Sequence, residues 1–274
     1  MRFWIFSDLH LEVQKISLPS VAPAGVDAIL CAGDLCQSYQ ISYWAEKIIS
    51  KYNLPLVLVP GNHEFFEGQS ANARIMRHKR NAMQQLAQAS TRWPQRLTVI
   101  DDSTTLIGDV QIIGGTLWTD FKLDAVSERD VAWRMNDAIS MAPDFSNIYT
   151  SPAKKLTPQS ALKMHRKTRA FIREQLEQAS GRKTLVLSHH LPHPDCTPEA
   201  YAGNKTNFLY ASSAEAFGDI FASDSAPALW VCGHTHQKID VTVGRTRIVG
   251  NPKGYQVDSH EKENGFRWDF VIEI

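Results

Sequence analysis

The stretch LVLVPGNHEFF, residues 56–66, joins an apolar run directly to three polar residues. Its first four residues are types that fill a buried β-strand, and the Pro-Gly pair after them ends such a strand sharply. Asn62, His63 and Glu64 follow at once. The segment thus predicts a core strand whose carboxyl end presents polar side chains.

Four other short apolar runs of the chain end in the same way. They are RFWIF before Asp8 and His10, AILCA before Gly33 and Asp34, TLVLS before His189 and His190, and ALWVC before Gly233, His234 and His236. Helical patterns at 42–52, 74–90, 157–180 and 212–222 lie between or beside these runs. Strands that alternate with helices predict an α/β fold with a largely parallel sheet. Ligands bind at the carboxyl ends of such strands, so we expect the polar clusters to converge there.

Two of the predicted helices carry starting signals. Thr157 is an expected N-cap, followed by Pro158 at the first helical position, and Gly181 lies where the helix should stop. Ser212 and Glu215 have the spacing of a capping box for the helix at 212–222. These signals predict where both helices begin.

Length and composition favour one large domain. The chain has 274 residues, 43% of them hydrophobic, and no stretch reads as a dividing linker, so we expect a single domain over residues 1–274. Residues 119–160 have mixed periodicity and are predicted to form a cap or an excursion beside the core. The 29 acidic and 29 basic residues balance, so no global field draws the protein to nucleic acid or to an anionic membrane.

The sequence lacks the usual features of secretion and membrane insertion. Its first residues, MRFWIFSDLH, do not have the pattern of a signal peptide, and no run approaches roughly 18 apolar residues. We therefore expect a cytoplasmic protein with no membrane partner. The four cysteines are too sparse for a disulfide framework and form no C-x-x-C pair, so they are expected to be buried free thiols.

The polar residues at the strand ends include seven candidate metal ligands. These are Asp8, His10, Asp34, Asn62, His189, His234 and His236. Imidazole nitrogens, carboxylates and an amide oxygen suit a borderline divalent transition metal. Seven donors exceed the needs of one catalytic ion but fit two ions about 3.5–4 Å apart that share a carboxylate, the geometry of two-metal phosphate ester hydrolysis. In DLH and in HTH the outer side chains project to the same side of an extended segment, so each motif can offer two ligands.

Taken in order, these motifs resemble a known family. Asp8-x-His10, Gly33-Asp34, Gly61-Asn62-His63-Glu64, His189 and Gly233-His234-Thr235-His236 look like the five signature blocks of the calcineurin-like metallophosphoesterases, which include bacterial members of unassigned substrate. The resemblance implies a four-layer α/β/β/α sandwich of two mixed sheets, with a dinuclear metal centre at the carboxyl ends of the strands. It further implies one metal held by Asp8, His10 and His236, another held by Asn62, His189 and His234, and Asp34 as the bridge. Manganese, iron and zinc all accept this set of ligands.

The resemblance also implies a catalytic role for His63. In the family this position holds the acid that protonates the leaving oxygen, while a hydroxide that bridges the two metals attacks the phosphate ester. Such an acid contributes typically about 10²–10⁴ in rate. His63 should face the substrate because its neighbour Asn62 faces the metals. Glu64, Asp8 and Asp34 are all candidates to orient its second nitrogen.

A small phosphomonoester or phosphodiester is the favoured substrate class, with a nucleotide as one candidate. Serine/threonine protein phosphatases have a downstream Asp-Arg-Gly that is missing after Asp34, and lipid-A-pathway pyrophosphohydrolases have arginine where this chain has His63. An Mre11-type nuclease is an alternative, with RIMRHKR (74–80) and KMHRKTR (163–169) as candidate contacts to a nucleic-acid backbone. Such charge runs are more often solvated helix faces, so nucleic acid is not the favoured partner. A noncatalytic protein-binding scaffold is a further alternative, which the complete ligand set disfavours.

Six other residues have roles that the sequence leaves open. Trp118, in GGTLWTDF, and Tyr255, in GNPKGY, would either border the site and stack on a ring or belong to the core and a turn. His190 should point away from the metals and either pack or support a ligand. His165, His193 and His260 are expected to be surface or hydrogen-bonded histidines.

Overall fold

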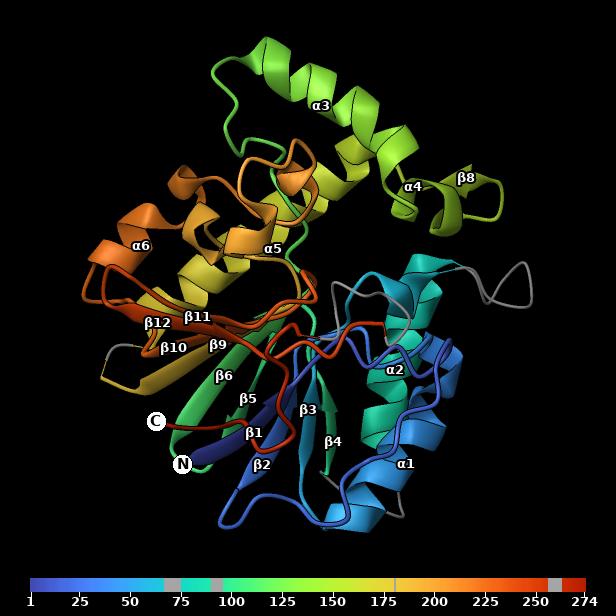
Figure 1. Ribbon diagram of the computed structural model, residues 1–274, viewed down its shortest axis with the longest axis vertical. Helices are drawn as coiled ribbons and strands as arrows, with labels where there is room; N and C mark the ends of the chain where they lie inside the picture. Colours follow the sequence, from blue (N-terminus) through green and yellow to red (C-terminus); the bar gives the residue numbers. More distant parts are fainter. Residues whose placement is uncertain (67–74, 90–95, 180, 256–262) are drawn as a thin grey trace.

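Two mixed β-sheets face each other and carry helices on their outer faces. The computed structural model describes residues 1–66, 75–89, 96–179, 181–255 and 263–274. Figure 1 shows the two sheets between α1 and α2 on one side and α5 and α6 on the other. The predicted four-layer α/β/β/α sandwich is confirmed.

The first sheet has the strand order β13-β1-β2-β3-β4. Its strands are β1 (Arg2–Phe6), β2 (Ala28–Cys31), β3 (Leu56–Leu58), β4 (Leu97–Val99) and β13 (Val271–Glu273). Strands β1 to β4 are parallel to one another, and β13 pairs with β1 in the antiparallel sense. Helices α1 (Ile41–Tyr52) and α2 (Met76–Ala89) cover the outer face of this sheet.

The second sheet has the order β11-β12-β10-β9-β6-β5. Its strands are β5 (Ser103–Ile107), β6 (Val110–Gly115), β9 (Lys183–Ser188), β10 (Leu229–Cys232), β11 (Ile239–Val243) and β12 (Thr246–Gly250). The four central strands are parallel and both edge strands are antiparallel. Helices α5 (Pro158–Gln178) and α6 (Gly218–Ala222) lie on its outer face.

Strand β1 shows how the sequence specifies this layering. Phe3 and Ile5 pack in the cluster between the sheets, whereas Trp4 and Phe6 pack in the cluster that includes the helices. All four side chains are buried, because alternate residues of a strand point to opposite faces and both faces are covered here. Full burial of such a side chain contributes about 1.5–3 kcal/mol.

Residues 119–160 lie between β6 and α5 in the chain. They contain α3 (Glu128–Met141), α4 (Asp144–Asn147), β7 (Tyr149–Ser151) and β8 (Lys154–Lys155). Ser127 caps α3 by accepting a hydrogen bond from the Asp130 backbone at 3.2 Å. Contacts of α3 with α5 and of β7 with α2 join this segment to helices on both sides of the sandwich.

The predicted helices agree with the structure except near residue 212. Helices α1, α2 and α5 occupy the expected ranges, and residues 74, 90 and 180 lie outside the described residues. Thr157 caps α5 as predicted. The single helix at 212–222 is wrong: a 3-10 turn at Ala214–Ala216 precedes the short α6. The hydroxyl of Ser212, the expected cap, has no hydrogen-bond partner in the described part of the chain, whereas the neighbouring Ser213 donates to Asp120 at 2.6 Å, so the capping box does not form.

Two further sequence expectations concern the membrane and the cysteines. Within the described ranges, no helix has the length and apolar character needed to cross a membrane. The four cysteines are buried free thiols, as expected.

Candidate active site

The polar residues that follow β1, β2, β3, β9 and β10 converge at one end of the sandwich. Ligand atoms of Asp8, His10 and His236 lie within 4.8 Å of one another, and so do those of Asp34, His189 and His234. A third group of the same kind consists of His10, Glu12 and His63. The structure therefore brings all seven candidate ligands and His63 into one centre.

Asp34 lies between the two groups. Its Oδ2 atom is 3.8 Å from Nε2 of His10 and 3.4 Å from Nε2 of His189. Nε2 of His10 lies 2.9 Å from Nε2 of His236, and Nε2 of His189 lies 3.0 Å from Oδ1 of Asn62. One carboxylate oxygen thus faces nitrogens of both groups.

The donor set fits two cations. Asp8 and Asp34 are almost completely buried, and within the described parts of the chain their ion-pair partners are histidines only. Buried carboxylates are normally paired with cations or coordinate metals. Burial raises the pKa of Asp34, but attraction to His189 and His63 outweighs this effect and holds the pKa well below its usual value. Burial lowers the pKa of His189, but Asp34 outweighs it and raises the pKa to about 9.

The backbone is strained where it presents these side chains. Five of the seven candidate ligands have a positive φ, namely Asp8 (53°), His10 (46°), Asp34 (51°), His234 (70°) and His236 (54°). Such a conformation costs about 1–3 kcal/mol per non-glycine residue and concentrates at functional sites. These five residues therefore adopt an unfavourable left-handed backbone conformation, which directs their side chains to a common centre.

The glycines of the motifs permit the close approach of the loops. A Cβ atom at Gly61 would lie 2.2 Å from Oδ1 of Asp34, and one at Gly33 would lie 2.5 Å from Nδ1 of His189. Both distances are far below van der Waals contact. The Gly-Asp and Gly-Asn-His-Glu motifs hence need glycine so that the candidate ligands can meet.

Glu64 joins two of the site's loops. Its carboxylate accepts hydrogen bonds from the backbone amides of Gly61 (2.7 Å), Leu35 (2.8 Å) and Asp34 (3.0 Å). Burial and the nearby Asp34 raise the pKa of Glu64 to about 8. Because its oxygens are engaged by the backbone, Glu64 is not the residue that orients His63.

Glu12 orients His63, a partner that sequence reasoning missed. Nδ1 of His63 lies 2.9 Å from Oε1 of Glu12, which is also 3.3 Å from Nδ1 of His10. The ring of His63 stacks on Phe66, and its Nε2 atom is 3.3 Å from the Tyr255 hydroxyl. Burial lowers the pKa of His63, but Asp34 and Glu12 outweigh it and raise the pKa. The signal was present in DLHLE, where Glu12 follows Asp8 and His10 at alternate positions.

Asp144 is a second partner that the sequence did not reveal. It lies on α4, in the segment at 119–160, and its Oδ1 atom accepts a hydrogen bond of 2.7 Å from Nδ2 of Asn62. This contact leaves Oδ1 of Asn62 facing His189. Burial raises the pKa of Asp144 to about 6, although the hydrogen bond from Asn62 opposes that rise.

Of the residues whose roles the sequence left open, some are buried in the interior and one lines the cavity. His190 is buried, its Nδ1 lies 3.1 Å from the Thr116 carbonyl, and its ring packs against Trp118. Burial and the neighbouring His189 lower the pKa of His190 to about 3, so it is a neutral packing residue. Trp118 is buried and does not line the cavity, whereas Tyr255 does. His165 is also buried.

The remaining histidines and the two basic runs lie elsewhere. The ring of His193 accepts a hydrogen bond from the Asp195 backbone, and His260 lies outside the described residues. The described part of the run at 74–80 starts at residue 75 and places Arg80 against Asp101. In the run at 163–169, Lys167 pairs with Asp102. Neither run supplies a described residue to the cavity.

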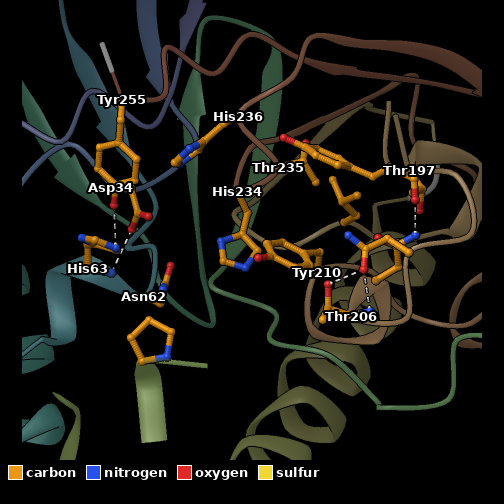
Figure 2. Close-up of a pocket in the computed structure, with 15 residues that line it drawn as sticks. Asp34, Asn62, His63, Thr197, Thr206, Tyr210, His234, Thr235, His236 and Tyr255 are labelled. Atoms are coloured by element: carbon orange, nitrogen blue, oxygen red, sulfur yellow. Dashed lines mark hydrogen bonds between the residues drawn. The ribbon is translucent and has the colours of Figure 1, made fainter. Parts of the chain in front are cut away.

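A cavity of about 320 Å³ opens beside the candidate metal centre. Figure 2 shows Asp34, Asn62 and His63 at one end and Thr197 and Thr206 at the other, with His234 and Tyr210 between them. Its lining residues are Asp34, Asn62, His63, Pro143, Leu191, Thr197, Tyr201, Asn204, Thr206, Asn207, Tyr210, His234, Thr235, His236 and Tyr255. The outer wall comes from residues 191–210, a stretch for which no role in the site was predicted from the sequence.

Comparison with known proteins places this centre in context. The family model for calcineurin-like phosphoesterases matches residues 1–238. The chain belongs to this family. It is a metal-dependent phosphoesterase of a family that uses dinuclear metal centres. A search of curated proteins found no match.

One of the solved structures similar to this chain shows the same fold. The phosphopantetheinyl hydrolase of Mycobacterium tuberculosis is similar at a TM-score of 0.68 and 18% identity, over 95% of this chain and 92% of that one. A dimetal phosphatase from Danio rerio has a TM-score of 0.44 and 13% identity, over 91% of this chain and 86% of that one. At these identities the likeness concerns the fold alone.

Proposed function

We propose that this phosphoesterase hydrolyses a small phosphate ester at two divalent metal ions held by the seven convergent residues. Asp8, His10 and His236 would hold one ion, and Asn62, His189 and His234 the other. Asp34 would contact both. The observation that carries this assignment is the position of Asp34 Oδ2, which faces His10 on one side and His189 on the other.

When bound, two such ions supply a nucleophile from water at neutral pH and neutralise the charge of the phosphoryl oxygens. Manganese is the ion we favour for first tests, with iron and zinc as alternatives because the same nitrogen and oxygen set accepts all three.

His63 acts as the general acid in this proposal. It lines the cavity, and Glu12 holds its Nδ1 atom, so the Nε2 atom is the one available on the side of the Tyr255 hydroxyl. A proton on Nε2 would pass to the departing oxygen of the ester. Glu12 stabilises the protonated ring and fixes its orientation.

Asp144 positions the amide of Asn62. Because the carboxylate accepts from Nδ2, the amide oxygen is fixed on the side of His189, where a metal ligand is required. Pro143 lines the cavity next to it. We therefore propose that residues 119–160 act as a cap within a single unit over 1–274, as the sequence predicted.

The proposed substrate is a small phosphomonoester or phosphodiester, with a nucleotide as one candidate. A cavity of about 320 Å³ is near the lower end of the usual range for ligand sites. The Mre11-type nuclease alternative is not favoured, since Arg80 and Lys167 pair with acidic residues away from the cavity. The scaffold alternative is not favoured either, since a noncatalytic protein has no need for a complete donor set.

A turnover screen tests the proposed function. The purified protein should hydrolyse members of a panel of phosphate mono- and diesters when Mn²⁺ is added. A chelator should abolish this activity, and a divalent transition metal should restore it. Undiminished turnover by protein shown to be metal-free would contradict the dinuclear assignment.

A further inference from the structure

The outer wall of the cavity is a closed loop that follows β9. It contains 3-10 turns at Pro194–Cys196, Glu199–Tyr201 and Asn207–Leu209. The two ends of the loop are tied together, since the Leu191 amide donates to the Tyr210 carbonyl and the Ser212 amide donates to Leu191, both at 3.0 Å. A loop fixed in this way presents its side chains from a defined position.

Two asparagines on this wall each form hydrogen bonds within the loop through one polar atom of the side-chain amide. Oδ1 of Asn204 accepts from the backbone and the hydroxyl of Thr206, at 3.0 Å and 2.9 Å. Nδ2 of Asn207 donates to the Tyr201 carbonyl at 2.8 Å. Both asparagines line the cavity. The loop therefore offers Nδ2 of Asn204 as a donor and Oδ1 of Asn207 as an acceptor.

Among the described lining residues, charge is confined to the metal end of the cavity. The ionisable acid and histidines of the described lining are Asp34, His63, His234 and His236, all in the candidate metal centre. The described lining contains no lysine, arginine or glutamate. The described lining beyond the centre consists of Leu191 and of the amide and hydroxyl groups of residues 197–210. A charged group placed there would find no partner of opposite charge among the described lining residues.

We propose that the group esterified to the phosphate is an uncharged arm that carries both hydrogen-bond donors and acceptors, of the amide or hydroxyl type. The metal centre and His63 would neutralise one phosphoryl group, and Asn204 and Asn207 would bind the arm. Arms with a second phosphate, a carboxylate or an ammonium group are rejected. This inference rests on the proposed phosphoesterase function and adds the chemical class of its substrate.

Matched esters test the proposal on the Mn²⁺-loaded protein. Phosphate esters of N-acetylethanolamine, ethanolamine, 3-hydroxypropionate and propanol differ in the arm but share a primary alkoxide leaving group. The neutral amide arm should have a kcat/KM at least about tenfold above the ammonium and carboxylate arms. Adenosine 5′-monophosphate and adenosine 3′,5′-bisphosphate form a second pair, which tests a nucleoside as the source of the same chemistry. The extra phosphate should again lower kcat/KM about tenfold or more.

A variant that adds a charge to the loop tests whether this loop determines the selectivity for the arm. Asn204→Asp keeps an oxygen that can accept from Thr206, but it replaces the Nδ2 donor by a negatively charged oxygen acceptor. It should raise the ratio of kcat/KM for the ammonium arm over the amide arm by about tenfold or more. Asn136→Asp on the exposed face of α3 adds the same charge away from the cavity and should leave that ratio unchanged.

Three results separate the proposals. A wild-type protein that hydrolyses charged arms as well as neutral ones, or an unchanged ratio in Asn204→Asp, would overturn the neutral-arm inference while the phosphoesterase function stands. No hydrolysis of any ester by protein with two bound metals would overturn the proposed function itself. Hydrolysis that prefers the amide arm, with the ratio shifted in Asn204→Asp, would support both.

Discussion

The carboxylate of Asp144 accepts a hydrogen bond of 2.7 Å from the side-chain amide of Asn62, although the two residues are 82 positions apart. The contact joins the segment at 119–160 to the strand-end motif that supplies a candidate ligand. An asparagine can present either its oxygen or its nitrogen, and the bond to Asp144 leaves the oxygen on the side of His189.

Asp144→Ala should lower metal affinity and turnover because Asn62 loses the partner that fixes its amide. Residues that orient a ligand typically contribute about 10–100-fold. Asp144→Asn retains an acceptor oxygen and should recover most of the loss. The measurements are metal titration and kcat on one ester, with Asp137→Ala on α3 as the control. Full metal affinity in Asp144→Ala would show that Asn62 needs no orienting partner.

Asp34→Asn should weaken both metal sites, because Oδ2 of Asp34 faces His10 in one group of ligands and His189 in the other. His10→Ala removes a ligand from one group and should leave the other ion bound. Elemental analysis of the two purified variants compares them directly, and circular dichroism checks that both remain folded. Retention of two ions at full occupancy in Asp34→Asn would show that the bridge is assigned to the wrong residue.

His63→Ala should slow the hydrolysis of alkyl phosphate esters far more than the hydrolysis of nitrophenyl phosphate esters. An alkoxide must be protonated as it leaves, whereas a nitrophenolate leaves without a proton. Turnover of the two ester types, with metal content measured in parallel, separates an acid from a ligand. Equal losses for both leaving groups with intact metals would indicate a charge-stabilising role, and loss of a metal would show that His63 is a ligand.

Glu12→Ala should reproduce the leaving-group dependence of His63→Ala in weaker form. Glu12 touches the acid through Nδ1 and would not touch the ester, so we expect a loss of about 10-fold on alkyl esters. Glu12→Gln keeps an oxygen acceptor for Nδ1 and should lie between Glu12→Ala and the wild type. An identical loss on alkyl and nitrophenyl esters would contradict the role of Glu12 as the orienting partner of His63.

His165 should make stability fall in acid. Burial lowers its pKa below the ordinary 6.5. The unfolded chain then binds the proton more readily than the folded one, so the free energy of unfolding decreases as pH falls below about 6.5, by at most about 1.4 kcal/mol per pH unit. His165→Gln cannot titrate and should show a smaller decrease between pH 7.5 and 5.5 in urea unfolding. The exposed His78→Gln is the control, and equal decreases in wild type and His165→Gln would contradict the prediction.

The sequence by itself determined an α/β fold and which polar residues would meet, whereas the four-layer arrangement followed from the family resemblance. Apolar runs such as LVLV and RFWIF are local signals of buried strands, and the polar residues directly after them must lie where parallel strands end. Glycine at 33 and 61 marked the turns that allow close approach. Short-range chemistry was enough for these features because strand, turn and candidate ligand are contiguous in the chain.

Only the tertiary structure decided which residues support that centre and what surrounds it. Glu12 reaches His63 across 51 positions and Asp144 reaches Asn62 across 82, and no local pattern in the sequence names either pair of partners. The loop at 191–210 is closed by backbone hydrogen bonds between its two ends, and the expected capping box of Ser212 and Glu215 gives way to a bond from the neighbouring Ser213 to Asp120. These hydrogen-bond partners depend on which segments pack together. A side chain bonds to the partner that the fold places beside it, which need not be the one nearest in sequence.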